Sequence, residues 1–560
     1  MKRKIVCLIA SSFIFCTLIF AQQNPKQWYL LDPKKDSTYG ISLNETYQFL
    51  KGKKYTPIIV AVIDSGVDTT QQDLKNVLWH NAKEIPNNGK DEDGNGYVDD
   101  VYGWNFLGNK NGADLESTTD EKTRVYYRFK NKYDGKIINE DSLNADEKAE
   151  YEEWKKAADQ MTITKEDQME VMMLEMVSKN LAKIDSVLRN EMNKNEYSIE
   201  ELEQFVPSSE GGKKAKLNYL RYMKLFEVTD DVTNTSILSD LKEETEGRQK
   251  SLNAKINPPP DYRAQIINDD YFNINDKYYG NADIMGLGPL HGTHVCGIIA
   301  AQRDNNIGIN GIADHVKIMM IRAIPDGDEY DKDVALAIKY AVDNGAKVIN
   351  MSFGKSFSPE KKWVDEAVQY AEKKDVLIVH AAGNEMHNID SVDNFPNTDL
   401  KTFHTTATNF ITVGASGDTH IADGNLIATF SNYGKNSVNI FAPGVKIYST
   451  LPYDSAYGYE SGTSMASPVV TGIAALIREY YPQLSAQQVK YVIEKSAVHL
   501  SDSVKVNKPG TNDKVSMSEL CTSGGFVNAS AALQLASTLK PDKKNIPILP
   551  KATLQTTKPN

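Results

Sequence analysis

The 560-residue chain is poor in three features that whole classes of protein need: cysteine, net positive charge and long apolar runs. It has four cysteines, and Cys7 and Cys16 lie in the N-terminal apolar run, which leaves too few for a disulfide scaffold. The formal net charge is −12, which argues against a protein that binds nucleic acid through a basic face. The longest apolar run, residues 5–20, is short for a bilayer span.

The N-terminus has the pattern of a signal peptide. Residues 2–4 are basic, the apolar run follows, and Ala21 is a suitable last residue before cleavage. A membrane anchor is the alternative, and the shortness of the run disfavours it. We therefore expect an exported protein that is secreted, periplasmic or held at the cell surface, with no membrane span in the mature chain.

Two cysteines remain after this segment, Cys296 and Cys521. Small buried cysteines are common core residues. We expect both to be part of the core, and a bridge between them stays open as an alternative.

A serine with small neighbours is the first candidate for chemistry. In the stretch SGTSMASP, residues 461–468, Gly462 permits a tight turn and Pro468 fits only the first turn of a helix. Ser464 is therefore expected where a turn becomes a helix, and a helix N-terminus favours developing negative charge. Such a site suits the nucleophile of an acyl transfer. The alternative is an ordinary Ser/Gly turn that caps a core helix.

Two further motifs favour the chemical interpretation. A β-branched run at residues 58–63 ends in DSGVD (residues 64–68), and HGTHVCG (residues 291–297) opens an apolar helix-like segment. Together with the serine motif they supply a carboxylate, an imidazole and a hydroxyl, in that order along the chain. The three motifs resemble those of the subtilisin-like serine peptidases, or subtilases, whose triad has this order. The resemblance covers roughly residues 55–108 and 280–535.

The resemblance implies a role for each group, and the chemistry of peptide hydrolysis agrees. Ser464 would be the nucleophile, His291 its general base, and Asp64 the carboxylate that orients the imidazole. The backbone N–H of Ser464 and the side chain of Asn384 would stabilise the oxyanion. His294, one turn after His291, is expected to be structural, and the spacing of the two histidines does not match a zinc HEXXH motif.

By the same resemblance, residues on two strand ends would bind the substrate backbone by strand addition. These are Ser352, Phe353, Gly354, Ala382 and Gly383. Lys355 stands where the family often has a glycine, and its cation is expected beside the cleft, where it would favour acidic residues or narrow the groove. The cleavage preference is left open.

Acidic residues suggest structural calcium. The segment DEDGNGYVDD, residues 91–100, places oxygen ligands at alternate positions with a glycine at the sixth, as in the first half of an EF-hand loop, although Tyr102 stands at the twelfth position. The candidate ligands are Asp91, Asp93, Asn95 and Asp99. A solvated acidic turn is the alternative. Asp73 and Asn305 match positions that ligate calcium in some subtilases and form a second candidate. No cofactor is expected to be required for the chemistry.

Residues 112–279 have a different composition, dominated by lysine and glutamate. Thr164 with Asp167, and Ser198 with Glu201, look like capping boxes at helix starts. Between them, apolar residues recur at three- and four-residue steps, as in an amphipathic helix: Met169, Met172, Met173, Met176, Leu181, Ile184 and Leu188. We expect this stripe to pack in a core or in a seam between helices.

The remaining chain predicts an α/β fold. Short apolar runs at residues 316–321, 347–351, 376–379 and 410–413 are spaced too widely for hairpins, which predicts parallel strands with helices on both faces. Together with the resemblance to the subtilases, this pattern leads us to expect a subtilisin-like three-layer fold with a parallel central sheet and a large, mostly α-helical insertion. The expected parts are a signal peptide at 1–21, an N-terminal extension at 22–54, a peptidase domain at 55–111 and 280–539, the insertion at 112–279, and a disordered tail at 540–560.

We expect an exported serine endopeptidase that acts on protein or peptide substrates through an acyl-enzyme and binds no nucleic acid. The alternative is a catalytically silent protein of the same fold that uses the helical insertion to recognise a partner. Loss of a triad residue would indicate the alternative, and Asp64, His291 and Ser464 are all present.

Overall fold

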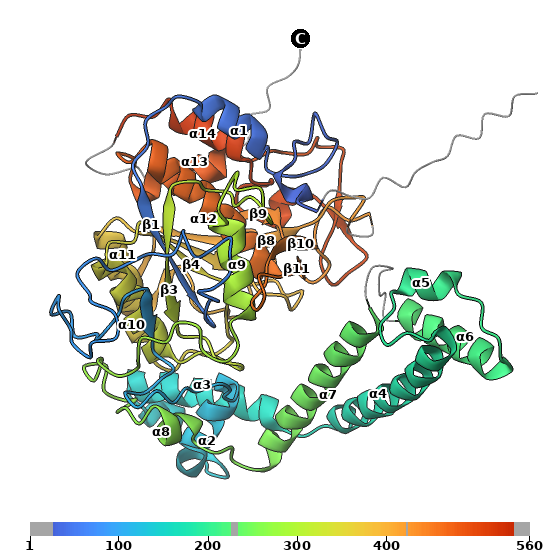
Figure 1. Ribbon diagram of the computed structural model, residues 1–560. Coiled ribbons are helices and arrows are strands. Elements are labelled where there is room, and N and C mark those ends of the chain that lie inside the picture. Colours follow the sequence, from blue (N-terminus) through green and yellow to red (C-terminus); the bar gives the residue numbers. More distant parts are fainter. Residues whose placement is uncertain (1–25, 226–232, 422–423, 542–560) are drawn as a thin grey trace, which may run out of the picture.

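The computed structural model describes residues 26–225, 233–421 and 424–541 (Figure 1). The predicted signal peptide, and all but the first two residues of the predicted tail, lie outside these residues. In the described part of the chain, no helix combines the length and the apolar character that a membrane crossing needs.

A seven-stranded parallel sheet forms the centre of the body, in the order β2-β3-β1-β4-β5-β8-β9. Its strands are β1 (Ile58–Asp64), β2 (Gly103–Asn105), β3 (Val316–Arg322), β4 (Val348–Met351), β5 (Leu377–Ala381), β8 (Phe410–Ser416) and β9 (Ile440–Pro443). The five strands predicted from apolar runs are therefore confirmed. The predicted fold class, a parallel α/β sheet, is confirmed as well.

Helices cover both faces of this sheet, and strand β1 shows how. Val60 and Val62 point into one core and Ala61 and Ile63 into the other, as alternation along a strand requires. Helices contributing to the first core are α1 (Leu43–Leu50), α9 (Leu290–Ala300), α12 (Thr463–Tyr480), α13 (Ala486–Lys495) and α14 (Ala529–Ala536). The second core contains side chains from α10 (Asp331–Asp343) and α11 (Lys361–Lys373).

Three two-stranded antiparallel ribbons decorate the body. They are β6 (Asp399–Leu400) with β7 (Thr405–Thr406), β10 (Ile447–Thr450) with β11 (Tyr457–Glu460), and β12 (Val506–Asn507) with β13 (Lys514–Val515). The β10–β11 ribbon leads directly into α12, so it bears on the position of Ser464.

Helices also fill the segment between β2 and α9. They are α2 (Glu121–Tyr133), α3 (Ala145–Met161), α4 (Lys165–Met192), α5 (Ile199–Gln204), α6 (Glu210–Leu225), α7 (Asn234–Ile256) and α8 (Tyr262–Ile266). Helices α2, α3 and α8 lie against the body, and α4 to α7 extend from it as an arm (Figure 1). The predicted capping boxes at Thr164 and Ser198 are both present.

The two ends of this excursion meet. Asn105 N donates to Asn281 O at 2.9 Å, and Asn281 N donates back to Asn105 O at 3.1 Å. This antiparallel bridge is reinforced by the two side chains, since Asn105 Nδ2 lies 3.0 Å from Asn281 Oδ1. The chain therefore leaves and re-enters the body at one point.

The N-terminal stretch is anchored in the body. Trp28 and Tyr29 are buried in the first core, and Trp28 Nε1 donates to Val445 O at 3.2 Å. Helix α1 packs against α14, so residues far apart in sequence close the same side of the sheet.

The methionine stripe differs from its prediction. Met169, Met172, Met173 and Met176 are between 61% and 68% exposed, while Leu181 and Leu188 are fully buried. The physical reason is that the first half of α4 has α7 on one side, whereas the second half also packs against α6. The methionines therefore lie on the face of α4 that no described helix covers. Cys296 and Cys521 are buried free thiols in separate cores, as the core interpretation predicts.

Candidate active site

The candidate residues lie at the carboxyl ends of neighbouring parallel strands. Asp64 is the last residue of β1, Ser352 follows β4 directly, and Asn384 comes three residues after β5. These strands are adjacent in the sheet, and the carboxyl ends of parallel strands are where polar functional groups collect. Helices α9 and α12, which carry His291 and Ser464, pack against each other beside this edge.

Asp64 and His291 form a direct contact. Asp64 Oδ1 lies 2.7 Å from His291 Nδ1 and also accepts from Ser65 N at 2.8 Å. Asp64 is buried, and its Oδ2 has no hydrogen-bond partner among the residues that the structure describes. Burial lowers the pKa of His291, but the Asp64 carboxylate outweighs burial, so the net pKa lies above the ordinary value.

Ser464 is the second residue of α12, as the turn-to-helix prediction requires. Its Oγ donates to Ser352 O at 3.1 Å, and Ser352 Oγ donates to Ser464 O at 2.8 Å. Among the hydrogen bonds of the described residues, none joins the Ser464 hydroxyl to His291. The hydroxyl is therefore held by the end of β4, and the predicted bond to the imidazole is absent from this arrangement. Such bonds are often open without substrate and tighten when it binds.

Asn384 is oriented by the residue before the serine. Its Oδ1 accepts from Thr463 N at 2.9 Å and from Thr463 Oγ1 at 3.0 Å, and within the described chain no hydrogen bond uses its Nδ2. A methyl group added at Gly462 would lie 3.5 Å from Asn384 Nδ2 and 3.6 Å from Ser464 N. Both donors therefore border the same small space, which this glycine leaves open.

A cavity of about 320 Å³ opens beside Ser464 and Asn384. Phe353, Gly354 and Gly383, three of the residues predicted to bind substrate, line it. The other two do not: Ser352 and Ala382 are buried behind the wall. Ala382 O accepts from Asn394 Nδ2 and Asn432 Nδ2, which fixes the loops that form the wall.

The expectation for Lys355 is wrong. Its side chain is buried, and its Nζ lies 2.7 Å from Glu121 Oε2 and 2.8 Å from Asp331 Oδ1. The ammonium group also donates to Glu329 O at 2.8 Å. The charge is therefore neutralised behind the cavity and offers nothing to a substrate. Its partners lie far away in the sequence, which is why the motif alone suggested an exposed cation.

His294 has the structural position that was predicted. It is buried, and its Nε2 lies 3.3 Å from Gly458 O. Burial lowers its pKa to about 3, so this imidazole stays neutral at any pH where the protein would work. The contact ties α9 to the β10–β11 ribbon that precedes α12.

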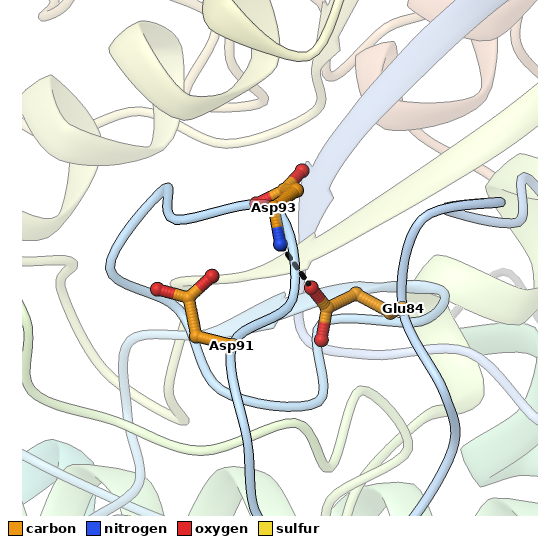
Figure 2. A group of neighbouring side chains, drawn as sticks. All are labelled: Glu84, Asp91 and Asp93. Atoms are coloured by element: carbon orange, nitrogen blue, oxygen red, sulfur yellow. Dashed lines mark hydrogen bonds between the residues drawn. The ribbon is translucent and has the colours of Figure 1, made fainter.

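Three carboxylates gather in the loop after β1. Glu84, Asp91 and Asp93 each offer an oxygen within 4.8 Å of the others (Figure 2). Asp93 N donates to Glu84 Oε1 at 3.2 Å, while Glu84 Oε2 is buried and has no hydrogen-bond partner in the described part of the chain. Burial raises the pKa of Glu84. A buried, unpartnered oxygen beside two further carboxylates is a donor set that suits Ca²⁺.

The other predicted ligands are arranged differently. Glu84 was not predicted, and Asp99 lies outside this group because its carboxylate accepts from Asn88 N at 3.0 Å and Gly89 N at 2.9 Å. Asn95 Oδ1 accepts from Tyr97 N at 2.7 Å, and Asn95 Nδ2 donates to Asp100 at 3.0 Å. Several of the oxygens that could bind a metal ion therefore accept hydrogen bonds within the loop and stabilise its conformation.

The second candidate pair is brought together. Asn305 Nδ2 donates to Asp73 Oδ1 at 2.6 Å, and Asp73 Oδ2 accepts from Ile309 N and Tyr457 OH, each at 3.0 Å. Asp73 is fully buried. In this arrangement protein donors satisfy both of its oxygens.

Comparison with known proteins places these motifs in context. A family model described as "Subtilase family" matches residues 56–518. The chain is 40% identical over 220 residues to the thermophilic serine proteinase of Bacillus sp. (strain AK1), which covers 39% of this chain and 48% of that one. It is 36% identical to subtilisin DY of Bacillus licheniformis, over 44% of this chain and 77% of that one. It is 34% identical to thermitase of Thermoactinomyces vulgaris, over 49% of this chain and 84% of that one. The match thus spans about half of the Bacillus AK1 proteinase and most of the other two.

Proposed function

This chain belongs to the subtilase family of serine proteases, and we propose that it is an endopeptidase that works through Asp64, His291 and Ser464. The single observation that carries the proposal is the 2.7 Å contact between Asp64 Oδ1 and His291 Nδ1 at the sheet edge that also holds the serine motif. The substrates are proteins or peptides, since the family acts on peptide bonds.

In the proposed mechanism His291 accepts the Ser464 proton through Nε2, because Nδ1 is occupied by Asp64. The hydroxyl first turns from Ser352 O toward the imidazole, a rotation about one side-chain bond. The Ser464 oxygen then attacks the peptide carbonyl, and His291 returns the proton to the leaving amine. Water then attacks the acyl-enzyme: His291 takes a proton from the water and returns it to the Ser464 oxygen, which releases the acid product.

The oxyanion is proposed to form in the space next to Gly462. Ser464 N and Asn384 Nδ2 border that space, and Thr463 fixes the Asn384 amide through its oxygen, which leaves the amide nitrogen free to donate. Donors that are held in place before reaction stabilise the developing charge without reorganisation.

The alternative is a silent subtilase-fold protein that binds a partner through its helical arm. The bond from Ser464 Oγ to Ser352 O, in place of one to His291, is the observation that favours it. Casein hydrolysis by the wild-type protein and by Ser464→Ala separates the two. We expect hydrolysis by the wild type alone, with labelling of Ser464 by a serine-directed phosphonate. Equal hydrolysis by both proteins would exclude Ser464 as the nucleophile, and inactivity of both with no labelling would favour the silent protein.

We also propose that Glu84, Asp91 and Asp93 hold a structural Ca²⁺. Support comes from their grouped oxygens and from the buried Glu84 Oε2, which no described residue contacts by a hydrogen bond. The ion would fix the loop between β1 and β2 and supply no chemistry. Asp73 and Asn305 are a second proposed calcium site, which rests on their resemblance to ligand positions in some subtilases and on their proximity; an ion there would have to displace the hydrogen bond from Asn305 Nδ2 to Asp73 Oδ1.

Export is the last part of the proposal, and it is supported by the basic and apolar residues before Ala21. N-terminal sequencing of protein from the medium, the periplasm or the cell surface should start at Gln22. Protein that begins at Met1 and stays in the cytoplasm would contradict export.

A further inference from the structure

The helical insertion forms one wall of the cavity beside Ser464. Asp120, the N-cap of α2, contributes to this wall, as do Lys122 in α2 and Gln160 in α3. Gly354 and Asn384 line the same cavity from the ends of β4 and β5. The helical insertion is far from the serine motif in the sequence, yet it borders the space next to the proposed nucleophile.

Contacts on both sides hold this wall in place. Lys156 Nζ, on α3, donates to Ser356 O at 2.8 Å and lies 2.9 Å from Asp393 Oδ2, so it clamps two loops of the body. In the opposite direction Lys355 of the body reaches Glu121 at the start of α2, at 2.7 Å. The wall is thus fixed relative to the cleft, and its side chains are part of the cavity.

The cavity has an excess of negative charge. Four carboxylates line it: Asp120, Asp328, Glu385 and Asp393. Two of them have cationic partners, since Asp120 lies 3.3 Å from Lys122 Nζ and Asp393 pairs with Lys156. The lining also includes Lys355, but its ammonium is bound to Glu121 and Asp331 behind the wall.

The other two carboxylates have only neutral hydrogen-bond donors, and the charges of Arg124 and Lys355 act on Asp328 without an ion pair. Asp328 Oδ2 accepts from Glu121 N at 2.7 Å, and Glu385 Oε2 accepts from Asn432 Nδ2 at 2.6 Å. Within the described parts of the chain, neither forms an ion pair. A carboxylate with free acceptor capacity in a concave site attracts a cationic group, and a guanidinium offers it several donors at once.

We propose that this cavity takes the side chain on the acyl side of the scissile bond and selects arginine or lysine, with the insertion forming part of the selecting wall. The inference rests on the proposed function, because it assigns the substrate of the same site. The edge at Phe353 and Gly354 would pair with the substrate backbone, which directs that side chain into the cavity. A cavity of about 320 Å³ is at the small end of ligand sites and fits one long side chain.

The test uses fluorogenic peptides that differ at one residue, arginine or its neutral isostere citrulline, directly before the cleaved bond. We expect kcat/KM for the arginine peptide to exceed that for the citrulline peptide by about ten-fold or more. The double variant Asp328→Asn with Glu385→Gln should reduce that ratio toward one. Equal rates for the two peptides in the wild type would overturn the proposal.

A second variant tests the insertion itself. Gln160→Lys places a positive charge on the wall from α3, and it should lower kcat/KM for the arginine peptide several-fold while leaving the citrulline peptide nearly unchanged. Gln168→Lys is the matched control, because Gln168 is exposed on α4 and lies outside the cavity lining, and both rates should be unchanged. An equal effect of Gln160→Lys on both peptides, or no effect on either, would remove the insertion from the selecting wall.

Binding distinguishes failure of this inference from failure of the proposed function. Fluorescence anisotropy with Ser464→Ala should show tighter binding of the arginine peptide than of the citrulline peptide, whether or not the wild type is active. Equal affinities would overturn the charge selection alone. Casein hydrolysis that persists in Ser464→Ala would overturn the proposed nucleophile and leave the binding preference standing.

Discussion

Asp64 Oδ1 and His291 Nδ1 lie 2.7 Å apart although 227 residues separate them in the chain. Most of that separation is the helical excursion between β2 and α9, and the contact itself joins the end of β1 to the start of α9. The relationship has an electrostatic consequence that can be measured: desolvation lowers the pKa of the partly exposed imidazole, and the carboxylate outweighs it, so the net pKa is raised.

The first prediction concerns Asp64→Asn. His291 must be neutral to act as a base, so kcat/KM should fall as the pH drops below its raised pKa. Without the carboxylate, desolvation is opposed only by the weaker attraction of Glu460, so the midpoint should move to lower pH, while the maximal rate drops by about 10⁴, the loss known for this change in another serine protease. A pH–rate profile checks both. Asp314→Asn, beside His315, is the control and should leave the profile unchanged. A midpoint that stays in place in Asp64→Asn would contradict the pairing.

The second prediction concerns the oxyanion. Asn384→Ala should lower kcat with little change in KM, because the amide acts only on the transition state. The expected loss is roughly 10²–10³, a magnitude taken from the removal of such a donor in a subtilisin. Steady-state kinetics on one peptide substrate measure it. Asn344→Ala, at the end of α10, is the control and should keep full activity. A rise in KM with kcat unchanged would assign Asn384 to ground-state binding.

The third prediction concerns metal removal. A chelator should lower the melting temperature by several degrees, since a ligand at about 100 times its Kd stabilises the folded state by about 2.7 kcal/mol. Added Ca²⁺ should restore the value. In Glu84→Gln the melting temperature should respond less to Ca²⁺, whereas Glu152→Gln, an exposed change on α3, should respond like the wild type. Thermal scans with and without chelator that coincide for the wild type would refute both calcium proposals.

The fourth prediction concerns Lys355. Lys355→Met removes the cation that Glu121 and Asp331 share. Glu121 keeps its ion pair with Arg124 at 2.7 Å, whereas Asp331 is left buried with neutral donors, and loss of one partner of a buried pair typically costs about 3–5 kcal/mol. Urea unfolding should show this loss in the free energy of unfolding. Lys362→Met, an exposed lysine on α11, should change it by less than about 0.5 kcal/mol. If the two variants unfold alike, the buried ion pair contributes nothing to holding the insertion.

Local patterns predicted much of this structure. The apolar run before Asp64 is a buried strand, and the boxes at Thr164 and Ser198 start helices, because strand burial and helix capping depend on residues close in sequence. The contact of Asp64 with His291 was also predicted, through the resemblance of the two motifs to those of the subtilases. The strand and the helix starts depend on information contained in a short stretch, whereas this contact depended on the resemblance.

The failures depend on contacts outside each motif. The stripe at Met169 and Met172 has the spacing of a packed helix face, but whether a helix covers it is decided by α6, which packs only against the second half of α4. The charge of Lys355 is neutralised by Glu121, more than two hundred residues earlier. A turn of the backbone brings Glu84 next to Asp91 and Asp93. Because Glu84 lies outside the alternating acidic pattern of residues 91–100, no motif marks it as a ligand.

The bridge between Asn105 and Asn281 makes the excursion a closed loop on the body. A cut anywhere along the exposed arm would leave two polypeptides, with Asp64 on one and His291 on the other. The hydrogen bonds between Asn105 and Asn281 would still hold the two polypeptides together at the sheet. A nicked molecule would therefore keep the proposed catalytic residues assembled by non-covalent contacts, so two bands on a denaturing gel would be compatible with an intact candidate site.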